Sequence, residues 1–241
     1  MIEATRAVFL HQVKYSETSV VATVYTEAFG RQAYIIQGVR NTKSKRKAGL
    51  LQPLFLLEIE AYHKPGREVQ QMKDFRLDTA FRTLPFDVSK SALALFLAEI
   101  LYKTIRNEEP DPPLFHYIYH SILLLDRMEK GTANFHLWFL TRLLPFLGFQ
   151  PENNFSPSFP WFDLKNGRFL QSRPLHPVAP SLDESALLSK LFDLDQDDLH
   201  TFRLTPSQRK RLLELLIEYY SIHSDSFGKI HSAGIFHDLF Q

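Results

Sequence analysis

Cysteine is absent from the 241 residues of this chain. The sequence therefore offers no disulfide framework, no thiolate ligand for zinc and no cysteine nucleophile. No apolar run approaches the roughly 20 residues that a membrane-spanning helix needs. The first residues, Met1–Arg6, lack the basic and apolar regions of a signal peptide. We therefore expect a cytoplasmic protein that makes no membrane contact.

Catalytic and metal-binding motifs are also missing. The nine glycines form no phosphate-cradling loop, no dinucleotide-binding fingerprint and no G-x-S-x-G elbow. Among ten histidines, His116 and His120 have the i,i+4 spacing of zinc ligands, but no third ligand accompanies them. Packed or solvated histidines explain this pair more simply. We expect no catalytic residue, no metal and no cofactor, and hence no enzyme.

Charge and aromatic residues divide the chain near residue 80. Residues 1–80 carry 12 Lys and Arg against 8 Asp and Glu, whereas residues 81–241 carry 16 against 19. Only four of the 21 phenylalanines lie in the first part. Two differently built domains, 1–80 and 81–241, are therefore predicted, and the basic first one is the better candidate for a polyanionic partner.

The first 80 residues have the pattern of strands. Several segments are rich in β-branched and aromatic residues, turn signals separate them, and apolar residues alternate along 55–62. The expected strands are Ile2–Tyr15, Val20–Thr26, 33–36, 55–62 and Val69–Phe75. Because no helical segment separates them, a small closed barrel of the OB-fold type is predicted, since closure removes exposed strand edges.

The remainder has the pattern of helices, which makes the expected fold class α+β. Helices are predicted over Ser89–Arg106, over Leu114–Met128 after the capping Asp111, over a buried Phe135–Leu147, and after the capping boxes that begin at Ser181 and Thr205. Between the predicted helix Phe135–Leu147 and the capping box at Ser181, residues 151–180 hold six prolines and several aromatics. We expect an ordered loop there, pinned on the helices.

The sharpest feature is the cationic segment, defined here as residues 40–47. It holds five basic residues in eight and neither an acidic nor an apolar side chain: Arg40, Lys43, Lys45, Arg46 and Lys47. As a loop between two barrel strands, it would contact nucleic-acid phosphates and release their condensed counterions. A solvated loop that only keeps the protein soluble is the alternative. Its place on the basic barrel favours the nucleic-acid interpretation.

Other barrel residues would extend such a surface. Arg31 and Arg67 lie on neighbouring strands or turns and are predicted to contact DNA, with Lys73 beside them. Three tyrosines, Tyr25, Tyr34 and Tyr62, could offer faces on which bases stack, although strand tyrosines more often belong to the core or rim.

The helical half holds a second set of cations. Arg209, Lys210 and Arg211 follow the helix start at Thr205, and Arg142 is the only charged residue of Phe135–Leu147. These four residues are candidates for binding an acidic partner. The simpler alternatives are long side chains that reach into water and, for Arg142, an internal pair.

Five blocks in the first 60 residues resemble a known family. They are Ser16–Ser19, Tyr25–Glu27 with Gly30-Arg31, Gly38–Arg40, Lys43-Ser44 and Leu51–Leu54. Their order and spacing resemble the N-terminal domain of bacterial RecO recombination mediators. The helical half resembles that family more loosely, through its length, the Leu147–Pro151 ending of the central helix and the 229–240 tail.

The resemblance implies an N-terminal OB-fold followed by a helical domain. It further implies binding of single- and double-stranded DNA, strand annealing, and work with RecR and the C-terminal tail of single-strand-binding protein to load the recombinase. Many members carry a four-cysteine zinc element where this chain has residues 151–180, so zinc is not carried over and aromatic packing is expected to replace it. An adaptor whose barrel binds little nucleic acid, or an enzyme acting on nucleic acid, stays open as an alternative.

Overall fold

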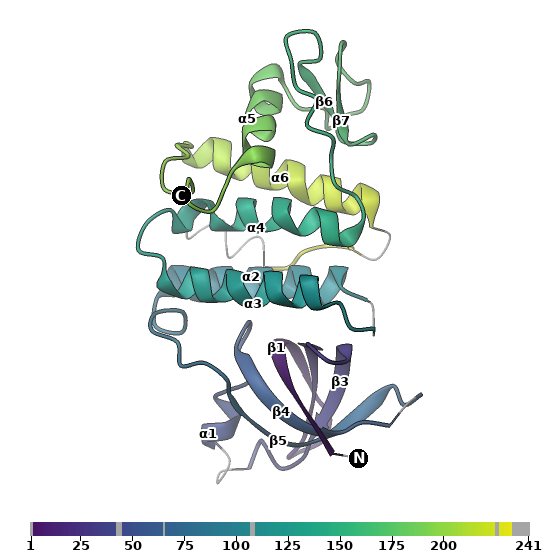
Figure 1. Cartoon of the computed structure of the whole chain (residues 1–241), viewed down its shortest axis with the longest axis vertical. Helices are drawn as coiled ribbons and strands as arrows, with labels where there is room; N and C mark the ends of the chain where they lie inside the picture. Colours follow the sequence, from purple (N-terminus) through teal and green to yellow (C-terminus); the bar gives the residue numbers. More distant parts are fainter. Residues whose placement is uncertain (1, 42–44, 65, 107–108, 225–226, 233–241) are drawn as a thin grey trace. The chain divides into compact units, whose positions relative to one another are not determined.

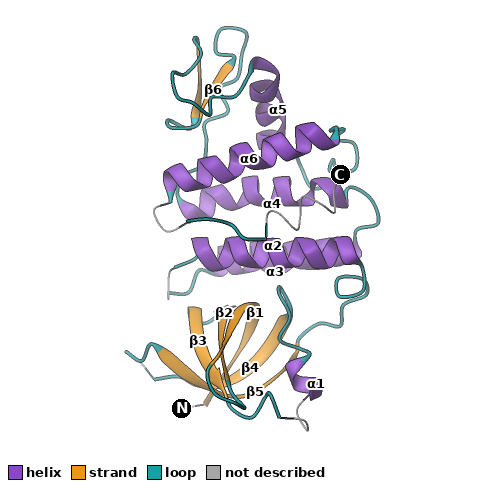
Figure 2. Cartoon of the chain, turned by 180° about the vertical axis from the view of Figure 1, so that it is seen from behind, coloured by secondary structure: helices purple, strands orange, loops and turns teal. Residues whose placement is uncertain are grey.

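The chain folds into two compact units with a mixed α+β composition. In the computed structural model (Figures 1 and 2), residues 2–41, 45–64, 66–106, 109–224 and 227–232 are described. The first unit comprises residues 1–127 and the second residues 128–241. The first holds a closed five-stranded barrel and the helices that follow it, and the second holds further helices and a small sheet.

The barrel follows the strands that the sequence predicts. Its strands are β1 (Ile2–Lys14), β2 (Val20–Thr26), β3 (Gly30–Ile36), β4 (Leu56–Tyr62) and β5 (Val69–Leu77). They pair in the order β1-β2-β3-β5-β4, and antiparallel pairing of β4 with β1 closes the barrel. The β3–β5 pairing is parallel, and the other pairings are antiparallel.

Alternation along the strands fills the barrel interior. In β3, every second residue is buried, and the intervening ones are half-buried. Large side chains such as Phe9, Tyr34 and Phe75 join β-branched and leucine side chains in one core cluster. The period of two in the sequence is therefore the pattern that packs the core.

The connection between β3 and β4 differs from the expected loop. It turns at Gly38, whose φ of 70° favours glycine, and the amide of Asn41 donates to the Gly38 carbonyl at 3.1 Å. A short helix α1 (Lys45–Ala48) then forms within the cationic segment. Lys43 lies outside the described residues, and for Lys45 only the backbone is described.

Two helices complete the first unit, and both occupy segments predicted as helical. α2 (Val88–Thr104) begins at the capping Asp87, and α3 (Pro112–Arg127) begins where Asp111 accepts a hydrogen bond from the amide of Leu114 at 3.0 Å. Both helices lie over one end of the barrel (Figure 1). A hydrogen bond of 3.4 Å from the Tyr25 hydroxyl to the Asp111 carbonyl joins β2 to the start of α3.

A buried carboxylate fastens the connection from the barrel to α2. The Asp126 carboxylate accepts backbone N–H groups of Arg82, Thr83 and Leu84 at 2.8–3.1 Å. The Lys90 ammonium donates to the Asp126 carbonyl at 2.9 Å. Burial alone would raise the pKa of Asp126, but these donors outweigh burial and hold that pKa below its usual range. The end of α3 thus organises the start of α2.

The second unit is built around a buried helix, as its apolar sequence predicts. α4 (Phe135–Leu143) continues as a 3₁₀ turn over Leu144–Leu147 and ends at the left-handed Gly148. α5 (Leu182–Asp193) and α6 (Pro206–His223) pack on it and on each other. Both predicted capping boxes are present, with Ser181 and Thr205 accepting the amides of Glu184 and Gln208.

Residues 151–180, expected to form an ordered loop in an otherwise helical half, also contain two short strands. A hairpin of β6 (Trp161–Asp163) and β7 (Arg168–Leu170) forms there and packs beside α5 (Figure 2). Gly167 has a φ of 63°, and a Cβ at this position would lie 2.6 Å from the Tyr219 hydroxyl. The hairpin turn thus requires glycine. The sequence did not predict this strand pair, because strands of three residues are too short to show a period of two.

Of the aromatics expected to pack in this segment, Phe162 and Phe169 are buried, whereas Phe155 is 39% exposed. Phe162 lies 4.9 Å from Phe169 and 5.2 Å from Phe192 of α5, measured between ring centroids. The side-chain amide of Asn154 pairs with the backbone of Phe169 in both directions, at 2.8 and 3.1 Å, as a strand would. Aromatic packing and hydrogen bonds therefore order this segment.

Candidate functional site

Hydrogen bonds within the turn between β1 and β2, residues Tyr15–Ser19, hold its backbone. The amides of Tyr15 and Ser16 both donate to the Ser19 carbonyl, at 3.1 and 3.2 Å. The Ser19 amide donates in return to the Ser16 hydroxyl at 3.1 Å. We call these residues the β1–β2 turn. Lys14, directly before it, is exposed.

Arg40 attaches the cationic segment to this turn. Its amide donates to the Thr18 carbonyl at 3.1 Å, and its guanidinium donates to the Ser16 carbonyl at 3.0 Å. The side chain nevertheless stays exposed, so that most of its N–H donors face solvent. The structure therefore brings Arg40 and the β1–β2 turn together, a pairing that the spacing of about 20 residues in the sequence does not indicate.

The described cations of α1 extend this surface. Arg46 and Lys47 are both exposed. Lys47 pairs with Asp74 of β5, whose pKa it lowers through that hydrogen bond. About half of each side chain of this pair is exposed, and such surface pairs contribute only ~0–1 kcal/mol. Breaking this pair would therefore cost the fold little.

Arg31, a predicted DNA contact, engages groups of the first unit. Its guanidinium donates to the carbonyls of Tyr102 and Ile105, at 3.0 and 2.8 Å, at the end of α2. It also lies over the Tyr102 ring, 4.6 Å from the centroid. Arg31 thus satisfies carbonyl groups that a helix end leaves unpaired, and its planar face is occupied. We therefore place it outside the candidate site.

Arg67 lies away from the cationic segment. It is exposed on the β4–β5 turn, where the buried Gln70 braces the backbone by accepting from the Lys64 amide and donating to the carbonyls of Lys64 and Arg67. His63 of this turn stacks on Phe29 with ring centroids 4.2 Å apart. Phe29 follows the end of β2 that is opposite to the β1–β2 turn, so Arg67 and Arg40 belong to different ends of that strand.

Two of the three tyrosines considered for base stacking are unavailable. Tyr25 and Tyr34 are 1% and 0% exposed, and burial raises the pKa of Tyr34 to about 12. Their rings fill the core and cannot receive a base. Tyr62, at 38% exposure, remains accessible. The sequence patterns did not single out Tyr15, which is 65% exposed; its place beside a polar turn was the available signal.

The outer face of β4 and β5 is electrically balanced. Arg76 pairs with Glu58, and Lys73 with Glu60, at 2.6 and 3.1 Å. These pairs are exposed on adjacent antiparallel strands. Lys73 therefore does not extend the positive surface, because Glu60 offsets its charge and raises its pKa.

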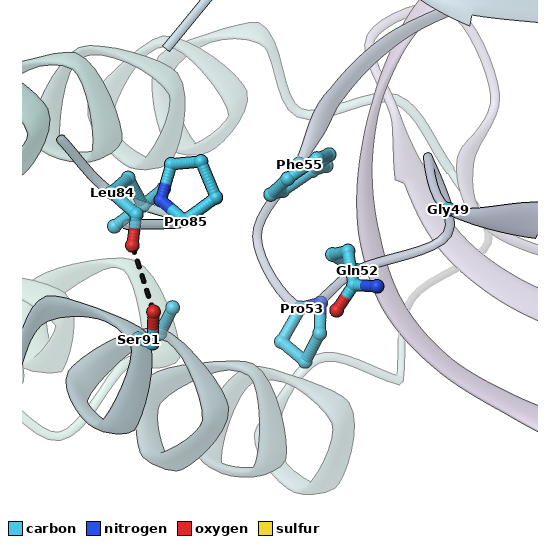
Figure 3. A pocket seen from close by; sticks show the side chains of 8 residues that line it. Gly49, Gln52, Pro53, Phe55, Leu84, Pro85 and Ser91 are labelled. Carbon is cyan, nitrogen blue, oxygen red and sulfur yellow. Dashed lines mark hydrogen bonds between the residues drawn. The ribbon is translucent and has the colours of Figure 1, made fainter. Parts of the chain in front are cut away.

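A pocket of about 230 Å³ lies within the first unit, close to the end of the cationic segment (Figure 3). Gly49, Gln52, Pro53 and Phe55 form one side. Leu84, Pro85 and Ser91 form the other, and Ala94 also lines the pocket. The Ser91 hydroxyl donates to the Leu84 carbonyl at 2.9 Å. The pocket holds no titratable side chain, so it offers a small, nearly neutral depression.

The predicted partner residues of the second unit are mostly engaged in internal contacts. Arg142 donates to the Leu194 carbonyl at 2.7 Å, which is the internal pairing that the sequence left open. Arg209 donates to the Asn134 side chain at 3.0 Å, and burial lowers its pKa. Arg211 pairs with Glu184 at 2.9 Å. Lys210 is exposed.

A second surface depression, of about 450 Å³, lies between the first turns of α5 and α6. Lys210 and Arg211 line it together with Glu184 and Glu214. Equal numbers of acidic and basic groups leave little net charge, so that this surface is less suited to a polyanion than the cationic segment is.

Within the described residues, no group of three or more His, Asp or Glu side chains has the placement to hold a metal ion. Nε2 of His116 lies 3.4 Å from Oε1 of Glu27, and the ring centroids of His116 and His120 are 6.3 Å apart. Among the helices of the described residues, none has the length and apolar content to cross a membrane.

Comparison with known proteins assigns both halves to one family. Residues 1–81 match the model "Recombination protein O N terminal", and residues 85–230 match "Recombination protein O C terminal". The chain is 38% identical over 241 residues to the DNA repair protein RecO of Bacteroides fragilis, and 35% identical over 240 residues to that of Phocaeicola vulgatus, each with 100% of both chains covered. It is 33% identical to the RecO of Flavobacterium psychrophilum, with 98% of both chains covered. The resemblance seen in the first 60 residues is thereby confirmed over the full length, and the chain belongs to the RecO family of DNA repair proteins.

Proposed function

We propose that this protein is a non-enzymatic recombination mediator that binds single- and double-stranded DNA through its barrel, which we take to be an OB-fold. It would anneal complementary strands and help load the recombinase onto DNA covered by single-strand-binding protein, with RecR and the tail of that protein as partners. The observation that carries the proposal is the exposed row of cations on the β3–β4 connection, anchored to the barrel by Arg40.

The geometry suits sequence-independent phosphate binding. Arg40, Arg46 and Lys47 are exposed on one connection. Phosphate contacts by Lys and Arg supply affinity and position, whereas base edges supply sequence information. The described part of the cationic segment has no exposed apolar anchor for a protein partner, which favours DNA over the adaptor alternative.

Charge reversal tests the proposal. In a variant with Lys43, Lys45, Arg46 and Lys47 changed to Glu, we expect weaker binding to any DNA sequence and an unchanged melting temperature. The log–log dependence of affinity on salt should flatten by roughly 0.7 for each single-strand phosphate that the variant no longer binds. Fluorescence anisotropy at several salt concentrations measures both quantities.

A matched control separates local binding from overall charge. Lys130, Lys165, Arg168 and Lys190 are exposed in the second unit, and their reversal changes the net charge by the same amount. We expect this control to keep most of the salt slope. An equal loss in both variants would reject the cationic segment as the site, and absence of DNA binding by the unaltered protein would favour the adaptor.

The partners RecR and single-strand-binding protein are proposed from family membership. Of the second-unit cations, Lys210 is exposed and Arg142 is engaged internally. A peptide from the acidic tail should therefore respond more to Lys210→Glu than to Arg142→Ala, once the folded fraction has been matched. The reverse order would assign the tail site to α4. We further propose a cytoplasmic location, where this DNA is found.

A further inference from the structure

The β1–β2 turn presents one aromatic ring beside the proposed phosphate-binding residues. Tyr15 is 65% exposed, well above the 38% of Tyr62 on β4. Lys14 precedes it, and the Ser16 carbonyl that follows it accepts the Arg40 guanidinium at 3.0 Å. In the sequence, the exposed Tyr15 thus lies between the exposed Lys14 and Ser16, the residue to which Arg40 is bound.

Hydrogen bonds hold the backbone from which this ring extends. The Tyr15 amide donates to Ser19, and Thr18 accepts the amide of Arg40. A tyrosine has only two side-chain torsions, so that ordering it costs little entropy on a rigid turn. Glu17 is the acidic residue of the turn, and the two flanking cations exceed its charge.

From this geometry we infer that Tyr15 stacks on an unpaired base and gives the proposed DNA site its preference for single strands; the inference rests on the proposed function. Lys14 and Arg40 hold the backbone, and the base next to the bound phosphates lies on the Tyr15 ring. Bases in a duplex already stack on each other and cannot offer a face, so Tyr15 adds affinity for single strands alone.

The first test compares strands with and without bases. The probes are oligothymidine of about 20 nucleotides, which exceeds the sites of roughly 4–16 nucleotides bound by such barrels, an abasic strand with the same number of phosphates, and a duplex of equal length. We expect Tyr15→Ala to weaken oligothymidine binding about fivefold or more, by the usual contribution of one stacked base. Binding to the abasic strand and the duplex should not change.

Two further variants identify the ring as the cause. Tyr15→Phe keeps the stacking face and should restore the affinity. Phe159→Ala is the matched control, because Phe159 is a ring of the second unit that is 38% exposed and lies outside the proposed site; it should bind all three probes as the unaltered protein does. Equal melting temperatures establish that each variant is folded.

Fluorescence supplies a readout that does not depend on affinity. The native tryptophans, Trp138 and Trp161, both belong to the second unit. In Tyr15→Trp, the emission of the new tryptophan is obtained by subtracting the emission of the unaltered protein. Oligothymidine should quench this emission, whereas the abasic strand should not.

The outcomes distinguish this inference from the proposed function. If charge reversal removes DNA binding but Tyr15→Ala binds oligothymidine normally, the stacking inference is wrong and the DNA site stands. If Tyr15→Ala weakens all three probes equally, the residue supports the turn and does not stack. If the unaltered protein binds none of the probes, both proposals are wrong.

Discussion

Asp126 shows how much one side chain contributes to this fold. Its carboxylate accepts three consecutive backbone amides, so that it caps the segment before α2 from the end of α3. It is 5% exposed, and an unpaired donor left in such a site costs about 1–3 kcal/mol. The connection from barrel to helices therefore depends on a residue distant in sequence.

We expect Asp126→Asn to lower the free energy of unfolding by about 2 kcal/mol near pH 7, because the amide group brings an N–H toward donors. The native pKa of Asp126 lies below its unfolded value. Its stabilising contribution is thus complete above the unfolded pKa of about 3.9 and is lost as pH falls through the native pKa. The difference in the free energy of unfolding between the unaltered protein and Asp126→Asn should therefore shrink below about pH 4.

Denaturant unfolding at pH 7 and at progressively lower pH measures this difference. Burial lowers the pKa of His136 to about 3, so both proteins lose stability below the unfolded histidine pKa of about 6.5 as the unfolded state gains a proton. That loss cancels in the comparison. A difference that stays constant down to the acid limit would show that the Asp126 charge is not what stabilises the connection.

At the scale of elements, the β6–β7 hairpin owes its order to a cluster of rings. Phe162 is 1% exposed between Phe169 and Phe192, and its amide donates to the buried Ser185 of α5 at 3.0 Å. Phe159, nearby in sequence, is 38% exposed. The two residues differ in burial and not in chemistry, which makes them a matched pair.

Phe162→Ala should lower the free energy of unfolding by about 3 kcal/mol, through reduced burial and the cavity left behind. Phe159→Ala should change it by about 0.5 kcal/mol or less. Thermal unfolding with and without EDTA completes the test, because a fold ordered by packing has the same melting temperature in both. A marked fall with EDTA would mean that a metal orders this segment.

Sequence patterns predicted well the elements whose residues follow a regular pattern along the chain. They predicted poorly the contacts between residues that are far apart in the sequence. The alternation over 55–62 and the capping boxes at Ser181 and Thr205 give local hydrogen bonds and burial, so that β4, α5 and α6 were predictable. The role of Arg31 was not predictable from the sequence, because the carbonyls to which it donates lie 71 and 74 residues away. The same holds for the other candidate site residues: a basic residue is recognisable in the sequence, but the groups that engage Arg142 and Arg209 are not.

At the scale of the whole molecule, the barrel depends on the helices that follow it in the first unit. Arg31 binds the end of α2, and Tyr25 bonds to the residue before α3. Arg6 of β1 lies over the Tyr119 ring of α3, 5.0 Å from its centroid. The compact unit accordingly ends at Arg127, whereas the family models divide the chain between residues 81 and 85. The boundary at residue 80 that the sequence predicts stays a prediction.

Two fragments decide between these boundaries. We expect residues 1–127 to unfold cooperatively and to keep the salt-dependent DNA binding of the full chain, because the partners of Arg31, Tyr25 and Arg6 all stay inside the fragment. A fragment of residues 1–81 lacks those partners, and should melt at a lower temperature or aggregate through the newly exposed end of the barrel. Circular dichroism melting and anisotropy titration measure both properties. Equal melting temperatures would show that the barrel is an independent domain and that α2 and α3 add to it no stability of their own.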